Sequence, residues 1–225
     1  MKYKYLFFIP ARKGSKSLRN KNIKRIGKKT LLEIAIEHAK KLSIKDSYVY
    51  ISTDSQKYKK ICENINFKIP FLRSKKNSRD NSNIINAILE FLQKSKYKFE
   101  NIILLQPTSP LRKISLFKKK IKLLDKKSIN SIISVKNIYR SEEFIFKIKK
   151  NNTINLKKSI RLNPNRQQNS ELFTPCGSFY ATKTNLLIKN RSFYNLPVLA
   201  VKTQFPDNID IDTNSDLKIV QSFKS

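Results

Sequence analysis

The sequence contains few of the residues that mark several common classes of protein. Its 225 residues include two cysteines, one histidine and no tryptophan. Cys62 and Cys176 lie far apart without a CxxC spacing, which excludes a cysteine-based metal site and predicts two reduced thiols. The longest apolar runs, such as residues 5–9, are far shorter than the ~20 residues that cross a bilayer. No charged-then-apolar leader opens the chain, so we expect a cytoplasmic protein without a membrane partner.

Acidic residues are also scarce, with 16 Asp and Glu against 48 Lys and Arg, and the formal net charge is +32. Such charge indicates nucleic-acid binding when it gathers in one footprint. Here the lysines are spread over every segment, and the abundance of Lys, Asn and Ile is typical of A- and T-rich codons. We interpret the charge mainly as solvated background, with nucleic-acid binding as the alternative. The basic excess would still attract anionic substrates.

What the sequence does contain is an alternation of strand-like apolar runs and helical periodicity. With 39% hydrophobic residues, the chain is long enough for one domain with a sizeable core. The expected strands are 3–9, 47–52, 67–72, 100–106 and 129–136, and the expected helices are 30–42, 55–64, 83–95, 113–125 and 215–224. This order predicts an α/β fold with a mainly parallel sheet and helices on both faces.

The pattern changes between residues 139 and 175, where a polar, Asn-rich stretch interrupts the alternation. An excursion of this length inside a domain is usually functional or forms an interface. We therefore expect a single domain, 1–225, with 139–175 as a protruding arm for dimerisation or substrate binding.

The first candidate site is the loop I-P-A-R-K-G-S-K-S-L-R-N-K-N at residues 9–22. In open parallel sheets, ligands bind beyond the carboxyl ends of the strands. Backbone N–H groups around Gly14 can form an anion-binding concavity, to which Lys16 and Lys21 add charge. Arg12 offers a planar fork for phosphate oxygens. The loop is neither a Walker A motif nor GxGxxG, so it suits a polyphosphate gripped by side chains; the alternative is a solvated basic turn.

Two further loops carry candidate residues. In L-L-Q-P-T-S-P-L-R, two prolines stiffen the turn after a strand and leave Gln106 at the sheet edge. Its amide could position a base or a sugar, or the turn could simply end the strand. Asp210 and Asp212 alternate with isoleucines, so on extended backbone both carboxylates face one side. Hard oxygen ligands beside a polyphosphate indicate Mg²⁺, and the alternative is capping of the following helix by Asp212 or Thr213.

Two other polar residues are interpreted as structural. His38 is the sole histidine and falls in the middle of an expected helix, far from these loops, which excludes a histidine-based mechanism. Asp54 stands at the start of an expected helix, where capping is its expected role.

These segments resemble the acylneuraminate cytidylyltransferases (CMP-sialic acid synthetases) and, more distantly, the CMP-Kdo synthetases. The matching stretches are the loop at 9–22, I-S-T-D-S at 51–55, L-L-Q-P-T-S-P-L-R at 104–112 and D-I-D-T-N-S-D-L at 210–217. The resemblance runs nearly end to end and implies a Rossmann-like nucleotidyltransferase fold. It also implies a homodimer that transfers CMP from CTP, with Mg²⁺, to the anomeric hydroxyl of an acidic nine-carbon 2-keto sugar, releasing pyrophosphate.

The resemblance assigns the candidate residues to three parts of one active site. The nucleotide part comprises Arg12, Ser15, Lys16, Lys21, Asn22 and Arg73. The sugar part comprises Gln106, with Arg166 and Gln167 at the sugar site or the subunit interface. The metal part is the pair Asp210 and Asp212, and the residues expected to act in catalysis are Arg12, Lys21, Asp210 and Asp212.

Two further alternatives concern the enzyme itself. A CMP-Kdo synthetase is disfavoured by Gln106 within Q-P-T-S-P-L-R, because that branch resembles a different, acidic motif there. A non-catalytic homologue is conceivable because Lys13 and Ser17 replace two usual glycines and Cys176 replaces a frequent asparagine. The presence of both aspartates and of the basic loop residues argues against it.

Overall fold

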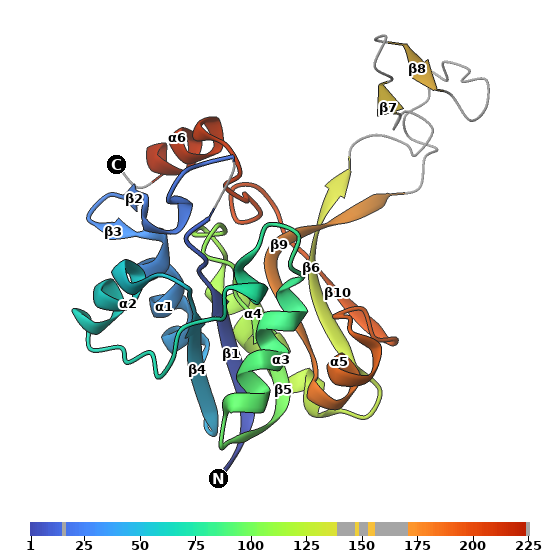
Figure 1. The fold of residues 1–225 in the computed structure, drawn as a ribbon. Coiled ribbons are helices and arrows are strands. Elements are labelled where there is room, and N and C mark those ends of the chain that lie inside the picture. Colours follow the sequence, from blue (N-terminus) through green and yellow to red (C-terminus); the bar gives the residue numbers. More distant parts are fainter. Residues whose placement is uncertain (15–16, 139–146, 149–152, 156–170, 224–225) are drawn as a thin grey trace.

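A six-stranded sheet forms the centre of the molecule, in the order β10-β6-β9-β5-β1-β4 (Figure 1). The computed structural model describes residues 1–223 except 15–16, 139–146, 149–152 and 156–170. The parallel strands are β1 (Lys2–Pro10), β4 (Ser47–Ser52), β5 (Lys98–Leu104), β6 (Ser131–Ile138) and β10 (Val198–Lys202). Strand β9 (Leu172–Lys183) runs antiparallel between β5 and β6. The predicted mainly parallel α/β sheet is therefore confirmed.

Helices cover both faces of this sheet, as predicted (Figure 1). They are α1 (Leu31–Leu42), α2 (Gln56–Glu63), α3 (Ile84–Lys94), α4 (Ile114–Ile121), α5 (Thr184–Asn190) and α6 (Asn214–Ser222), with 3-10 turns at Lys21–Ile23, Lys76–Ser78 and Lys122–Asp125. Helices α1, α2 and α4 contribute side chains to the core on one face, and α3 and α5 to the core on the other. Two short pairs, β2 (Arg25–Ile26) with β3 (Lys29–Thr30) and β7 (Lys147–Ile148) with β8 (Ile154–Asn155), lie outside the sheet.

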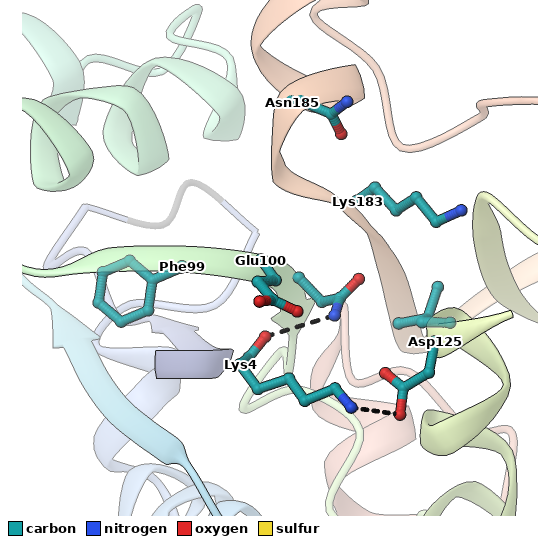
Figure 2. A pocket seen from close by; sticks show the side chains of 8 residues that line it. Lys4, Phe99, Glu100, Asp125, Lys183 and Asn185 are labelled. Atoms are coloured by element: carbon teal, nitrogen blue, oxygen red, sulfur yellow. Dashed lines mark hydrogen bonds and ion pairs between the residues drawn. The ribbon is translucent and has the colours of Figure 1, made fainter. Parts of the chain in front are cut away.

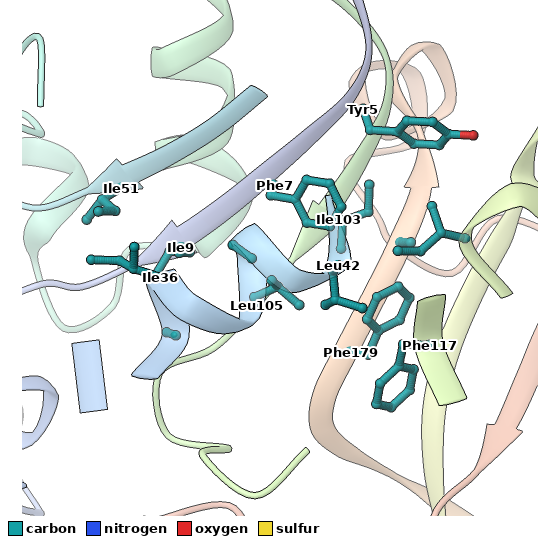
Figure 3. Packing of buried hydrophobic residues seen from close by; sticks show 14 of the residues in the cluster. Tyr5, Phe7, Ile9, Ile36, Leu42, Ile51, Ile103, Leu105, Phe117 and Phe179 are labelled. Carbon is teal, nitrogen blue, oxygen red and sulfur yellow. The ribbon is translucent and has the colours of Figure 1, made fainter. Parts of the chain in front are cut away.

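The alternation of side chains along β1 explains why both faces are covered. Tyr5, Phe7 and Ile9 point into the core beneath α1 and α4 (Figure 3), whereas Leu6 and Phe8 point into the core beneath α3. All five side chains are buried, so this strand is apolar on both faces. A central parallel strand is expected to have this composition because helices exclude water from each side of it.

A third hydrophobic cluster joins the two ends of the chain. Leu18 from the opening loop and Ile211 from the segment between the two aspartates belong to it, together with residues of α1 and α6. Helix α6 lies beside β2 and β3 (Figure 1), and Gln221 Nε2 donates a hydrogen bond to the Arg25 carbonyl at 3.0 Å. The packing of Ile211, which is fully buried, is worth about 2 kcal/mol. This cluster fixes the aspartate segment against the basic loop.

The structure corrects the expectation of a strand at 67–72, because this segment has no regular structure. Asn66 adopts a left-handed conformation (φ 58°), and Pro70 has no N–H to donate to a neighbouring strand. Ile69 is nevertheless buried in the core, which accounts for the apolar run in the sequence. Each of the five expected helices corresponds to a helix of the structure. Strand β10, helix α5 and most of strand β9 were not predicted from the sequence.

The predicted arm at 139–175 stays largely a prediction. Within it only 147–148, 153–155 and 171–175 belong to the part of the chain that the structure describes. Among the described helices, none has the length and apolar character needed to cross a membrane.

Candidate active site

A cleft of about 250 Å³ lies where strands β1 and β5 end, at the sheet edge where ligands were expected. It is lined by five of the predicted site residues, namely Arg12, Lys21, Asn22, Arg73 and Gln106. The structure thus brings together residues from three separate segments of the chain. The predicted residues Ser15, Lys16, Arg166 and Gln167 lie outside the described residues.

The opening loop is held in place by hydrogen bonds to its backbone. Asn22 is buried, and its Nδ2 donates to the Arg12 carbonyl at 2.9 Å. The Lys13 N–H donates to Asp54 Oδ1 at 2.8 Å. Asp54 was expected to cap α2, but the cap is Ser55, whose side chain accepts from the Tyr58 N–H. Asp54 therefore contacts the basic loop and does not cap the helix.

The Arg12 side chain crosses the cleft towards residues 78–80. Its Nη1 lies 2.7 Å from Asp80 Oδ1 and 3.4 Å from the Ser78 carbonyl. This ion pair is partly exposed, with about a third of the Arg12 side chain accessible to solvent. A triphosphate could compete with such a pair because an exposed ion pair contributes only about 0–1 kcal/mol.

Arg73 forms the floor of the same cleft at the end of β4. The side chain is buried, and it donates from Nε to Ser52 Oγ at 2.9 Å and from Nη2 to the Ser52 carbonyl at 2.7 Å. Burial lowers the pKa of Arg73 to about 10, so it remains charged at neutral pH. The hydrogen-bond partners of Arg73 are neutral, and the nearby charges of Asp54 and Glu90 partly offset its burial, so it adds a cation beside the cleft.

Ser82 was not assigned a role from the sequence, and the structure places it in the cleft wall. Its hydroxyl oxygen is buried and has no hydrogen-bond partner among the described residues. A buried hydroxyl without a partner costs free energy, so its place in a cleft indicates that a polar ligand could satisfy it. The sequence carries no local signal for this, because Ser82 stands in a polar stretch among many similar residues.

The basic loop and the aspartate pair meet, although about 190 residues separate them. Lys21 Nζ lies 2.9 Å from Asp212 Oδ1 and donates to the Ile211 carbonyl, also at 2.9 Å. The Ile211 N–H donates to the Thr108 carbonyl at 2.8 Å, which adds the Gln106 loop to the same assembly. Three loops that lie far apart in the sequence therefore form one site.

Asp210 lies at the centre of this assembly and faces Gly177. A Cβ atom at Gly177 would lie 2.7 Å from Asp210 Oδ2 and 3.6 Å from Gln106 Oε1. The φ of Gly177 is +79°, which side chains rarely tolerate, and a register shift in the β6–β9 pairing sets this turn. Burial raises the pKa of Asp210, while a hydrogen bond from Thr108 opposes the rise. Gly177 thus allows an amide oxygen and a carboxylate to share one small space.

The donor set suits Mg²⁺ completed by water and substrate oxygens. Mg²⁺ is usually held by one or two carboxylates. Asp210, which lies close to the amide oxygen of Gln106, and Asp212, which pairs with Lys21, are the two carboxylates that would hold it. No group of three or more His, Cys, Asp or Glu residues that could hold a metal ion occurs in the described part of the chain. Asp212 or Thr213 was the alternative candidate for the cap of the following helix. The structure shows that Thr213 caps α6, in a capping box with Asp216, so the Asp212 carboxylate does not cap this helix.

A larger cavity of about 390 Å³ lies near the opposite edge of the sheet and contains none of the predicted site residues (Figure 2). Its charged groups are largely paired with one another or with close neighbours. Lys4 Nζ lies 2.7 Å from Asp125 Oδ2, and Glu100 Oε1 lies 2.7 Å from Lys2 Nζ. Lys183 also lines this cavity, and its Nζ donates to the neutral oxygens of the Lys126 carbonyl and Asn130 Oδ1. We place the chemistry in the smaller cleft because the predicted site residues gather there.

Comparison with known proteins agrees with this placement. A sequence profile of the cytidylyltransferase family matches residues 6–221, and the chain belongs to that family. The family resemblance carried by the four sequence motifs is therefore confirmed.

Among individual proteins, the chain is similar to a CMP-N,N'-diacetyllegionaminic acid synthase of Legionella pneumophila, with 29% identity over 96% of this chain and 94% of the relative. It is also 25% identical to an N-acylneuraminate cytidylyltransferase of Streptococcus agalactiae over 95% of this chain, which spans 51% of that relative. A solved structure of a CMP:2-keto-3-deoxy-manno-octonic acid synthetase complexed with CTP superposes with a TM-score of 0.70 at 16% identity, covering 98% of both chains. This likeness confirms the nucleotidyltransferase fold.

Proposed function

We propose that the protein transfers CMP from CTP to the anomeric hydroxyl of an acidic nine-carbon 2-keto sugar, with release of pyrophosphate. The observation that carries this proposal is the contact of Lys21, which lines the cleft, with Asp212 and with the Ile211 carbonyl, because it joins the cationic loop to the segment that carries both aspartates. Membership of the cytidylyltransferase family and the names of the two curated relatives support the choice of CTP and of a nonulosonic acceptor.

The reaction forms one bond and breaks another at the α-phosphorus of CTP. The anomeric oxygen of the sugar attacks this phosphorus, the bond to the bridging oxygen of the β-phosphate breaks, and pyrophosphate leaves. Negative charge builds on phosphoryl oxygens, so positioning and charge neutralisation contribute most to the rate. In this proposal Arg12 and Lys21 bind phosphate oxygens after exchanging their present partners, Asp80 and Asp212.

The remaining residues orient the two substrates. Arg73 and Asn22 line the nucleotide side of the cleft, and Gln106 lies on the side proposed for the sugar. In this proposal one of the two aspartates accepts the proton of the attacking hydroxyl, and burial, which raises the pKa of Asp210, favours proton uptake by that carboxylate. Bound Mg²⁺, held by Asp210 and Asp212, would supply charge neutralisation at the phosphates and a lower pKa for the attacking hydroxyl.

Pyrophosphate release is the direct test. The purified protein is incubated with CTP, Mg²⁺ and each of N-acetylneuraminic, legionaminic and pseudaminic acids and Kdo. Release with one or more of the nine-carbon acids supports the proposal, whereas release with Kdo alone would favour the CMP-Kdo alternative. No release, combined with salt-sensitive retention on random DNA, would favour nucleic-acid binding.

A homodimer in the cytoplasm is part of the same proposal. The dimer rests on the family resemblance and on the arm at 139–175, and the location rests on the use of CTP. Light scattering coupled to size-exclusion chromatography distinguishes the dimer from the 26.4 kDa monomer.

A further inference from the structure

Arg112 is a buried arginine to which the proposed reaction gives no role. It ends the stretch L-L-Q-P-T-S-P-L-R, and only 3% of the residue is exposed. Burial lowers its pKa to about 10, the nearby charge of Asp210 opposes this fall, and Arg112 stays charged at neutral pH. Its three described contacts are with uncharged groups on Gln106, Ser178 and His38. Burying a charge costs free energy, and these hydrogen bonds together with the nearby charge of Asp210 offset that cost.

The three contacts reach three separate segments around the site. Nη2 donates to the Gln106 carbonyl at 2.5 Å, and Nε donates to the Ser178 carbonyl at 2.7 Å. Nη1 lies 3.2 Å from His38 Nδ1 in α1. Because arginine only donates, His38 Nδ1 accepts, and the ring carries its proton on Nε2. His38 was expected to be far from the candidate loops, but it contacts the last residue of one of them.

The two carbonyl contacts lie next to the groups that surround Asp210. Gln106 presents its Oε1 towards Gly177, and Ser178 is the residue that follows Gly177 in β9. A planar guanidinium binds both carbonyls in one fixed geometry, since its donors cannot rotate independently. A lysine ammonium is a point charge on a flexible stem and cannot hold both with the same geometry.

We propose that Arg112 is a positioning residue that fixes the Gln106 loop against the Gly177 turn, so that the amide of Gln106 and the carboxylate of Asp210 are aligned before substrates bind. The expected effect on kcat and KM rests on the proposed function, whereas the expected effect on the order of the two loops does not. Arg12, Lys21 and Arg73, on the nucleotide side, make no described contact with Arg112. Loss of the guanidinium contacts to the Gln106 and Ser178 carbonyls is therefore expected to impair use of the sugar more than use of CTP.

The variant Arg112→Lys tests this by keeping the charge and removing the fork. We expect kcat to fall about 10-fold or more and KM for the sugar to rise, with KM for CTP within about 2-fold of the wild type. Hydrogen exchange, read without substrates, is expected to quicken in residues 105–109 and 176–179 but not in α2 or α3.

The matched control is Asn195→Ala, which removes buried hydrogen bonds to Thr182 and to the Ser192 carbonyl at the other end of β9. It is expected to lower the melting temperature without changing the ratio of the two KM values. If Arg112→Lys does not fold, His38→Leu removes one partner of the guanidinium and is expected to produce the same selective pattern with a smaller amplitude.

The outcomes separate the two proposals. Wild-type protein that releases no pyrophosphate with any acceptor overturns the proposed function, while the exchange experiment still decides the role of Arg112. Unchanged exchange at 105–109 and 176–179, or a uniform increase like that of the Asn195→Ala control, overturns the positioning role. Equal losses for CTP and sugar would also overturn it.

Discussion

Replacing Gly177 by alanine perturbs the centre of the site with a single methyl group. The added Cβ would lie 2.7 Å from Asp210 Oδ2, which is closer than real Cβ atoms approach other atoms, and 3.2 Å from its Cγ, which is a tight contact. The Asp210 side chain or the β9 turn must therefore move. The left-handed backbone at φ +79° adds a second cost, because alanine tolerates it poorly.

The expected magnitudes differ for stability and for activity. Left-handed strain costs about 1–2 kcal/mol for a residue with a Cβ. For a chain of this length, that corresponds to a fall in Tm of about 2–8 °C. Displacement of a reacting group by about 1 Å can lower a rate ~100-fold, so we expect kcat of Gly177→Ala to fall by about that factor.

Pyrophosphate release under saturating CTP measures the rate, and calorimetry measures Tm. Gly27→Ala is the matched control, because Gly27 also has a left-handed φ of 56° but lies in the β2–β3 turn. It is expected to lose similar stability and to keep its activity. If Gly177→Ala turns over as fast as the wild type, the placement of Asp210 against Gly177 is refuted. If Gly27→Ala loses as much activity as Gly177→Ala, the loss is due to backbone strain alone.

Three further predictions concern single side chains. Asp212→Ala is expected to abolish turnover while Tm changes by little, because the Asp212 side chain is 71% exposed and Lys21 keeps its hydrogen bond to the Ile211 carbonyl. Full activity would exclude a metal role for Asp212. Lys21→Met is expected to raise KM for CTP about 10-fold or more, since it removes charge-assisted hydrogen bonds, and an unchanged KM would remove the loop from the site. Burial raises the pKa of Glu90, but hydrogen bonds from Lys94, Asn77 and Ser74 outweigh this and lower the pKa to about 2. The stabilisation is complete above the ordinary pKa of ~4.3 and is lost as the pH falls through about 2. Because the Lys94 partner is 46% exposed and solvent screens the pair, Glu90→Gln should cost about 1–2 kcal/mol at pH 7 and progressively less in acid, as urea titrations at several pH values would show.

Local patterns were sufficient for most helices and for the central strands. Helix α1 begins after Thr30, which forms a capping box with Glu33, and both residues are adjacent in sequence to an amphipathic run. Strand β1 is apolar on both faces, and this signal needs no partner to be recognised. The segment 67–72 shows the limit, because an apolar run predicts burial, and burial does not require a strand.

The orientation of β9 and the cap of α2 could not be read from the sequence. Apolar alternation is the same in parallel and antiparallel strands, so only the pairing with β5 and β6 reveals the direction of β9. In Ser52-Thr53-Asp54-Ser55 several neighbouring residues can cap a helix, and the fold selects Ser55 because Asp54 contacts the Lys13 N–H.

The sequence by itself determined the class of fold, the three loops at the carboxyl edge of the sheet and the chemical character of each. These are properties of short segments, in which periodicity, charge and residue type act locally. Only the tertiary structure decided that Lys21 meets Asp212, that Gly177 accommodates Asp210, and that Arg112 joins Gln106 to β9. Such contacts depend on how distant segments pack around a shared core, and a single sequence contains no local signal for the distance between them.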